Sequence, residues 1–215
     1  MCEGPRAAGK RNAPTDVPSS KHRAGYDKDD PPSTGGDTAG TKIEIGGGDA
    51  LQWGDGEYGV VLAHGAVFDA ASWEDQATAI ADQGATVVAV EDIAPESIAA
   101  AVAKLQDDGH ADVALVGGSA GADAILQLAS QQPDLPDQLV LLSPNRVVDG
   151  LGGEPKLFIA SEDEPVAHVS QQLADGSPGV DNEVILLPGS AHAQNIFAGE
   201  SGDAALQAIL ERLAN

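Results

Sequence analysis

Six apolar runs recur along the chain between residues 59 and 189, and each is apolar at consecutive positions instead of alternate ones. This pattern is typical of strands in a parallel sheet that helices cover on both faces. The sequence therefore predicts a frame of six parallel strands. The runs are GVVLAHG (59–65), ATVVAVE (85–91), DVALVGG (112–118), QLVLLSP (138–144), KLFIASE (156–162) and EVILLPG (183–189).

Helical patterns lie between these runs. After residue 119, for example, apolar residues recur at spacings i, i+3, i+4 and i+7, which places them on one face of a helix. A leading hairpin of weaker strands is predicted over residues 41–53. The alternation of strands and helices predicts an α/β fold with a doubly wound, mostly parallel sheet. Helices are predicted over 72–84, with Ser72 as N-cap, and over 94–109, 120–131 and 206–213.

Composition divides the chain at about residue 41. Residues 1–41 are rich in Pro, Gly, Ser and charge and have almost no large apolar residues. Such a segment buries too little surface to offset the entropy of ordering it, so a disordered polar tail or linker is predicted there. Residues 42–215 are long enough for one folded domain with its own core.

Charge is just as uneven along the chain. Residues 1–42 hold seven of the eleven Lys and Arg and six of the 34 Asp and Glu, which leaves residues 43–215 with four basic and 28 acidic residues, a formal charge of −24. So acidic a body repels phosphates and anionic lipid headgroups, which argues against partners such as nucleic acids and membrane surfaces. The same balance fits either a halophilic surface or high solubility without a need for salt.

Cys2 is the only cysteine, which excludes an internal disulfide and a thiolate metal cluster. No run of 18 apolar residues occurs, and the N-terminus lacks the apolar stretch of a signal peptide. The expected location is therefore cytoplasmic, without membrane insertion, and an exported lipoprotein anchored near Cys2 is the alternative. The oligomeric state is left open.

The most informative motif is GGSAG, in which Gly117 and Gly121 stand two residues before and after Ser119. A strand that turns sharply into a helix brings these two positions together, where any Cβ would clash. Such a turn either needs small residues for its own sake or holds Ser119 up for attack on a substrate. The motif follows an apolar run and precedes a helical pattern, the setting of a nucleophilic serine, so we expect Ser119 to be a nucleophile.

A nucleophilic serine needs a base. His192 follows the last apolar run in the loop GSAHAQN, and so lies with Ser119 at the carboxyl edge of the predicted sheet. His110 precedes a strand and lies at the opposite edge, while His22 lies in the tail. His168 is the competing base, but its helix is expected to turn it outward. His192 is therefore the predicted base.

The base in turn needs an acid that orients its ring. The segment SEDEPV, at the end of the fifth apolar run, supplies Glu162, Asp163 and Glu164. Asp163 is the preferred acid by residue type. Glu164, directly before Pro165, is the alternative that the sequence leaves open.

Backbone N–H groups complete the predicted site. The helix after Ser119 points its N-terminus at the serine, so the Ala120 N–H is an expected donor to an oxyanion. Gly65 ends the first run and lets the chain turn so that the Ala66 N–H faces Ser119 as a second donor. His64 is expected to form local hydrogen bonds.

Apolar residues flank these segments and are candidates for contact with the acyl group of a substrate. Some of them are expected to belong only to the core. The preferred candidates are Val67, Phe68 and Phe197, and the others are Val166 and Ile196.

The order of Ser119, then Asp163 or Glu164, then His192, each after a successive predicted strand, resembles the α/β-hydrolase superfamily over about residues 58–213. HGAV looks like its oxyanion segment, GGSAG like its nucleophile elbow, SEDEPV like its acid turn and GSAHAQN like its histidine loop. The resemblance implies the fold of that superfamily and serine hydrolase chemistry, with no metal and no cofactor.

Two features depart from many members of that superfamily. Gly118 stands before Ser119, where a bulkier residue is common, and only 11 residues, 145–155, separate the fourth run from the fifth, where many members insert a helical cap. The expected protein is thus a capless small esterase, similar to dienelactone hydrolases, that cleaves a small carboxylic ester through an acyl-enzyme on Ser119. The alternatives are a non-catalytic binding module of the same fold and an acyltransferase with the same three residues.

Overall fold

The computed structural model describes Met1 and residues 39–214 of the chain. The disordered tail predicted over residues 1–41 lies almost wholly outside the described residues, and the first strand begins at Thr41. In the part of the chain that the structure describes, no helix is both long and apolar enough to cross a membrane.

One sheet of eight strands organises the described residues, in the order β1-β2-β4-β3-β5-β6-β7-β8. The six predicted runs form β3 to β8, and every neighbouring pair among them is parallel. The predicted leading hairpin is the antiparallel pair β1 and β2, and β2 also runs antiparallel to β4. The bounds are β1 Thr41–Ile45, β2 Gly48–Trp53, β3 Tyr58–Ala63, β4 Ala85–Val90, β5 Val113–Gly118, β6 Gln138–Leu142, β7 Lys156–Ser161 and β8 Asn182–Leu187.

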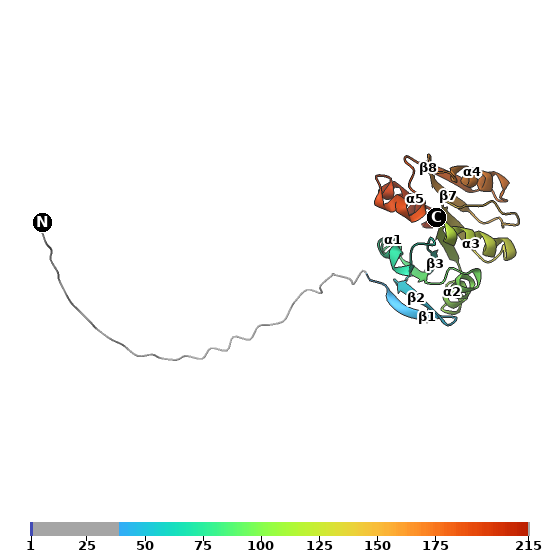
Figure 1. Ribbon diagram of the computed structural model, residues 1–215. Helices are drawn as coiled ribbons and strands as arrows, with labels where there is room; N and C mark the ends of the chain where they lie inside the picture. The colour runs from blue at the N-terminus through green and yellow to red at the C-terminus, as the bar shows by residue number, and fades with distance from the viewer. Residues whose placement is uncertain (2–38, 215) are drawn as a thin grey trace. The chain divides into compact units, whose positions relative to one another are not determined.

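Helices cover both faces of this sheet, as Figure 1 shows: α2, α3 and α4 lie on one face and α1 and α5 on the other. Consecutive strand residues point to opposite faces, so Val61 lies in one core and Val60 in the other. Because both faces are buried, the runs show no alternation, and the α/β prediction is confirmed. The bounds are α1 Glu74–Ala81, α2 Pro95–Asp107, α3 Ala120–Gln131, α4 Ala167–Gly176 and α5 Gly202–Leu213.

The start of the first helical segment corrects the predicted cap. A short 3-10 turn, η1 (Ala70–Trp73), precedes α1, and its N-cap is Asp69, whose carboxylate accepts the Ser72 N–H at 2.9 Å. Ser72, the predicted N-cap, donates its hydroxyl to the Asp69 carbonyl oxygen instead. The turn therefore begins three residues earlier, at a carboxylate that satisfies a free N–H of its first turn.

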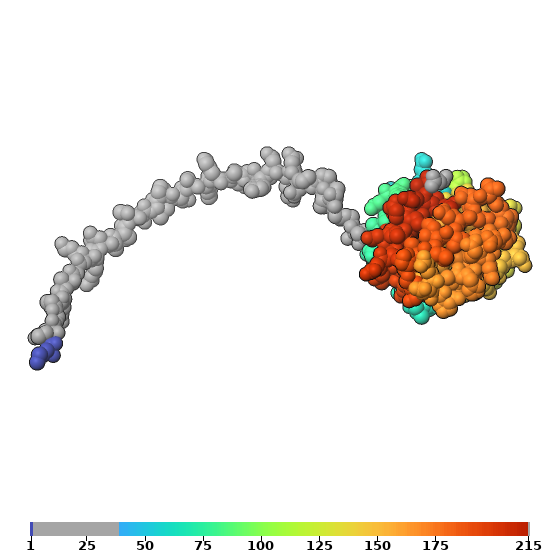
Figure 2. Space-filling view, turned by 90° about the horizontal axis from the view of Figure 1, so that it is seen from above, coloured from blue at the N-terminus to red at the C-terminus, as the bar shows by residue number. Residues whose placement is uncertain are grey.

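The parallel strands β5, β7 and β8 end at the same edge of the sheet, called the carboxyl edge below, and the loops that follow them meet there. β8 is the outermost strand, and only its last residue, Leu187, is buried. In Figure 2 the segments after β7, drawn from orange to red, form much of the visible face. The last two strands of the sheet, β7 and β8, thus supply two of the loops at the carboxyl edge.

Candidate active site

Ser119 sits between the end of β5 and the first residue of α3 with φ +51° and ψ −111°, a conformation that L-residues rarely adopt. Its neighbours explain why the turn is so sharp. A Cβ on Gly121 would lie 2.2 Å from the Ala63 carbonyl oxygen, and one on Gly117 would lie 2.8 Å from the Ala122 nitrogen. The two glycines therefore allow the approach of β3 and α3 that holds Ser119 at the strained turn.

His192 lies in the loop after β8, and its Nε2 is 2.8 Å from Ser119 Oγ. The imidazole is partly open to solvent, with 37% of its side-chain surface exposed. The other histidines considered lie elsewhere: His168 is exposed on α4, and His110 Nδ1 contacts the Glu57 carbonyl at the opposite edge of the sheet. The structure thus brings together the serine and the histidine that the sequence singled out.

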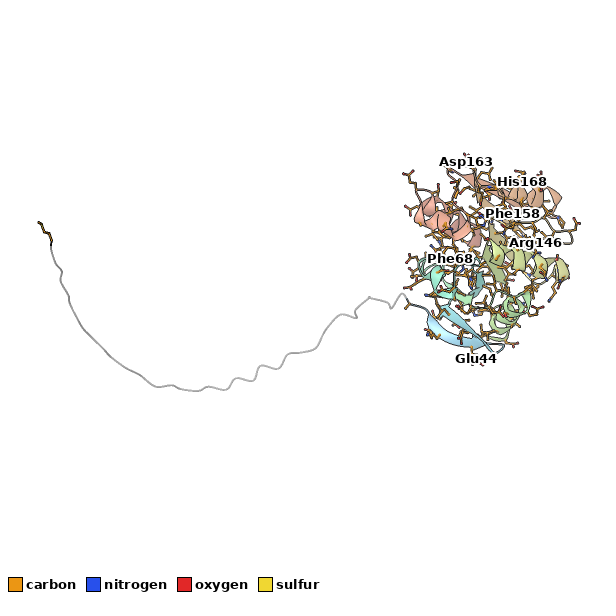
Figure 3. All side chains as sticks on the ribbon, in the orientation of Figure 1. Glu44, Phe68, Arg146, Phe158, Asp163 and His168 are labelled. Carbon is orange, nitrogen blue, oxygen red and sulfur yellow. The ribbon has the colours of Figure 1, made fainter. Side chains whose placement is uncertain are left out.

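The carboxylate beside His192 belongs to Glu164, whose Oε2 lies 2.6 Å from His192 Nδ1. Asp163, the preferred acid in the sequence interpretation, is exposed (Figure 3), and its N–H instead donates to the Gly189 carbonyl. The turn after β7 directs the second of the two carboxylates inward, so the preference for Asp163 is corrected to Glu164. The side chain of Glu164 is fully buried.

Two serines complete the surroundings of Glu164. Its Oε1 accepts the Ser143 hydroxyl at 2.7 Å and the Ser161 N–H at 2.9 Å, so both carboxylate oxygens are hydrogen-bonded. Ser143, which follows β6, also accepts the Ala193 N–H at 2.8 Å, and both residues have positive φ. Ser143 thereby fixes the carboxylate to the histidine loop. The sequence interpretation missed it, because a serine at the end of a strand carries no signal of a buried role.

The turn after β3 lies against the nucleophile. A Cβ on Gly65 would lie 3.6 Å from Ser119 Cβ, in ordinary contact, and 3.3 Å from the Phe68 ring, so Gly65 lies directly beside the nucleophile. The Gly65 carbonyl accepts the Phe68 N–H at 2.9 Å and lies 2.8 Å from His64 Nδ1. Since the N–H of Ala66 is in the same planar trans peptide group as this oxygen, the two point in opposite directions, and holding the oxygen also fixes the N–H.

Ala120, the other expected oxyanion donor, is the first residue of α3, so its N–H has no acceptor within the helix. Asn145 lies nearby and was also missed by the sequence interpretation. Its Nδ2 is 3.4 Å from Ser119 Oγ and 3.0 Å from Asp123 Oδ2, and its N–H donates to Asp123 Oδ1. One side of the nucleophile is therefore polar.

The candidate substrate contacts divide into two groups. Ile196 is buried in one core, Val166 packs against the other, and Phe197 packs edge-on against Trp73 with ring centroids 6.0 Å apart. Val67 is 87% exposed on the turn after β3, and the half-buried Phe68 lies beside Gly65. Phe68 is thus placed near the nucleophile and Val67 is exposed on the same turn, whereas the other three contribute to packing.

Two further observations describe the surroundings of the site. Within the described ranges, no group of three or more His, Cys, Asp or Glu side chains is arranged to hold a metal ion. The connection between β6 and β7, residues 143–155, contains no helix, so no cap stands over the serine from that side.

No protein-family model and no curated protein sequence matches this chain. Solved structures do. EstE5, in a crystal soaked with p-nitrophenyl butyrate, is 16% identical at a TM-score of 0.70, with 83% of this chain and 85% of that chain covered. The monoacylglycerol lipase of Paleococcus ferrophilus is 15% identical at a TM-score of 0.66, with coverage of 80% and 99%.

A predicted CIB-like hydrolase from Thermoplasma acidophilum is 18% identical at a TM-score of 0.63, with 82% of this chain and 97% of that chain covered. The chain has the α/β-hydrolase fold. At these identities the similarity shows the fold alone. The fold class expected from the sequence is confirmed, including the lack of a cap domain in the described residues.

Proposed function

We propose that the protein is a serine hydrolase that cleaves carboxylic esters through an acyl-enzyme on Ser119. The observation that carries the proposal is the unbroken hydrogen-bonded series from Ser119 Oγ through the His192 ring to the buried Glu164 carboxylate, with distances of 2.8 and 2.6 Å. Nucleophile, base and orienting acid are the three groups that acyl transfer of this kind uses.

Each group has a defined part in the reaction. Glu164 accepts a hydrogen bond from His192 Nδ1–H, which leaves the lone pair of Nε2 free to take the proton from the Ser119 hydroxyl as it attacks the ester carbonyl. The Ala66 and Ala120 N–H groups stabilise the negative charge on the tetrahedral oxygen. His192 then gives its proton to the leaving alcohol, and a water activated in the same way releases the acid from Ser119.

The substrate we propose is small, or is an ester presented at the surface of something larger. Ser119 is half-buried, the His192 side chain is 37% exposed, and the connection after β6 forms no cap. A long acyl chain would lack the apolar enclosure that binds it, because three of the five candidate contacts are used in packing. The EstE5 structure, soaked with a short-chain ester, is consistent with this size class.

Labelling with a fluorophosphonate tests the proposal. Wild-type protein is expected to be labelled once, on Ser119, and Ser119→Ala is expected to abolish labelling, while Ser190→Ala, which alters an exposed serine in the histidine loop, leaves it intact. Folded wild-type protein that takes no label would refute the proposal and favour a non-catalytic binding module. Product analysis with added alcohols separates hydrolysis from acyl transfer, since an acyltransferase forms a new ester.

A further inference from the structure

Gln194 lies two residues after His192 in the short helix η2 (Ala193–Ala198), and only 6% of its surface is exposed. Its side chain reaches across the carboxyl edge of the sheet to two segments near the start of the domain. Oε1 accepts the Gly65 N–H at 2.7 Å, and Nε2 donates to Ser72 Oγ at 2.7 Å. Nothing in the hydrolase reaction itself calls for an amide at this position.

The hydrogen bonds around Gln194 assign the orientation of its amide. Ser72 donates its hydroxyl proton to the Asp69 carbonyl oxygen, so its oxygen is available to accept from Nε2. The Gly65 N–H is a donor only, so it requires the oxygen of the amide. Both ends of the side chain therefore have partners that only a glutamine satisfies: a carboxylate has no donor for Ser72, and an apolar side chain leaves a buried N–H unpaired.

Gly65 is the point at which this contact bears on the reaction. Gln194 Oε1 accepts its N–H, while its carbonyl accepts the Phe68 N–H and lies 2.8 Å from His64 Nδ1. Gln194 therefore holds the His64–Gly65 peptide, and the contacts to the Gly65 carbonyl hold the next peptide, Gly65–Ala66, whose N–H is the proposed oxyanion donor. A direct link from the histidine loop thus fixes the residue that directly precedes an oxyanion donor.

We propose that Gln194 is a positioning residue for the reaction: it holds the Gly65 N–H, one peptide before the oxyanion donor of Ala66, at a fixed distance from His192, so that the oxyanion donor and the base move as one unit. The inference rests on the proposed function, because it assigns a partner to the same site. Donors that are already in place when the charge develops stabilise the transition state without reorganisation, and a misplacement of about 1 Å can cost about 100-fold in rate.

The test compares three variants with the wild type. Gln194→Met keeps the length of the side chain and removes both hydrogen bonds, so we expect kcat to fall about 10- to 100-fold with KM changed less than about 3-fold. Ser72→Ala keeps the Gly65 bond of Gln194 but removes its outer bond, together with the bond from the Ser72 hydroxyl to the Asp69 carbonyl, and is expected to cost about 2- to 5-fold in kcat. Asn195→Ala, an exposed neighbour in the same helix, is the matched control and should leave both constants unchanged.

A readout specific to the oxyanion separates positioning from a general loss of structure. A trifluoromethyl ketone forms a tetrahedral oxyanion on Ser119, so its inhibition constant should rise in Gln194→Met by the same factor by which kcat/KM falls. The end-point of fluorophosphonate labelling counts folded, competent molecules and is expected to match the wild type.

Three outcomes would overturn the inference: unchanged kcat in Gln194→Met, an unchanged inhibition constant despite a lower kcat, or a fall in kcat explained wholly by a lower labelling end-point. Should Gln194→Met fail to fold, Ser72→Ala decides, since a kcat equal to the wild type contradicts the proposal. Wild-type protein without labelling would instead refute the proposed function, so the two failures are distinguishable.

Discussion

The two edges of the sheet differ in the residue types that have positive φ, although Gly46, Gly47 and Gly189 also have positive φ at the carboxyl edge. At the amino edge, where the chain turns into β3, β4, β5 and β8, the residues with positive φ are glycines, among them Gly84 and Gly109. At the carboxyl edge, the three non-glycine residues with positive φ, Ser119, Ser143 and Ala193, lie within one hydrogen-bonded network.

Buried polar groups differ between the edges in the same sense. At the amino edge, Lys156 donates to three backbone carbonyls, and Tyr58 donates to Asp137 and accepts from Gln138, so these groups satisfy one another and tie loops together. At the carboxyl edge the network ends at the half-exposed Ser119 hydroxyl. Among the described residues, the non-glycine residues with positive φ, each at a cost of about 1–3 kcal/mol, are thus confined to the carboxyl edge, where the proposed site lies.

The largest expected effect separates the two neighbouring carboxylates at the carboxyl edge. Glu164→Gln keeps the size of the buried side chain but favours the wrong tautomer of His192, so turnover is expected to fall about 10⁴-fold. Asp163→Asn, the matched control at the exposed neighbour, should change turnover less than about 2-fold. Steady-state kinetics of both variants provide the comparison, and equal losses would mean that the site is not organised around Glu164.

A smaller effect is expected at Ser143. Replacement by Ala removes a donor to Glu164 and the acceptor of the Ala193 N–H, so kcat should fall about 10- to 100-fold. Ser143→Gly loses the same hydroxyl but relieves the positive φ, and is expected to be about 1 kcal/mol more stable than Ser143→Ala. Kinetics and urea unfolding measure the two effects, and a Gly variant less stable than the Ala variant would contradict the strain argument.

At both edges glycine is expected to be more stable than alanine where φ is positive, and only activity should distinguish the edges. At the carboxyl edge, Ser119→Gly is expected to exceed Ser119→Ala by about 1 kcal/mol in unfolding free energy, because only the glycine tolerates φ +51° without cost. At the amino edge, Gly109→Ala should lose about 1–2 kcal/mol, since φ is +107° there, although no atom would clash with the added methyl. Urea unfolding of the three variants gives the values, and activity of Gly109→Ala should match the wild type.

The smallest expected effect is a dependence of stability on alkaline pH that arises at the amino edge. Burial raises the pKa of Tyr58 above its ordinary value of 10.0, with the Gln138 side chain lowering it and Asp137 raising it further. Above pH 10 the unfolded chain ionises this phenol while the folded protein keeps it neutral, so stability falls as pH rises. Tyr58→Phe should flatten this fall in thermal melts above pH 10, and an unchanged slope would contradict it.

The strands and the loops that carry the candidate site residues could be predicted from the sequence. The side-chain geometry of the site could not. Consecutive apolar residues such as Val60 and Val61 report burial on both faces, and the chain order of Ser119 and His192 reports which loops share an edge. Whether Asp163 or Glu164 turns inward depends on the few backbone angles after β7, which residue type does not encode. The same holds for the N-cap of the first helical segment, which is Asp69 and not Ser72 because the turn begins three residues earlier.

Residues that act only through long-range contacts gave no local signal. Gln194 lies 129 residues from its partner Gly65, and Ser143 lies 50 residues from Ala193. A lone Gln or Ser in a loop looks like any solvated residue until the fold brings its partners together. The core residues can therefore be predicted from hydrophobic periodicity, whereas residues such as Gln194 and Ser143, which hold the site in place, are identified only from the three-dimensional structure.

The outer place of β8 has a consequence for how the protein would lose activity. Five of its six residues are not buried, so this strand can detach at a lower free-energy cost than the central strands. His192 follows β8, and detachment would carry the imidazole away from Ser119 and expose Leu187, while the central strands β3, β5 and β6 stay paired. For the proposed hydrolase, activity is therefore expected to vanish at urea concentrations well below the midpoint of global unfolding and to return on dilution, as a reversible local inactivation.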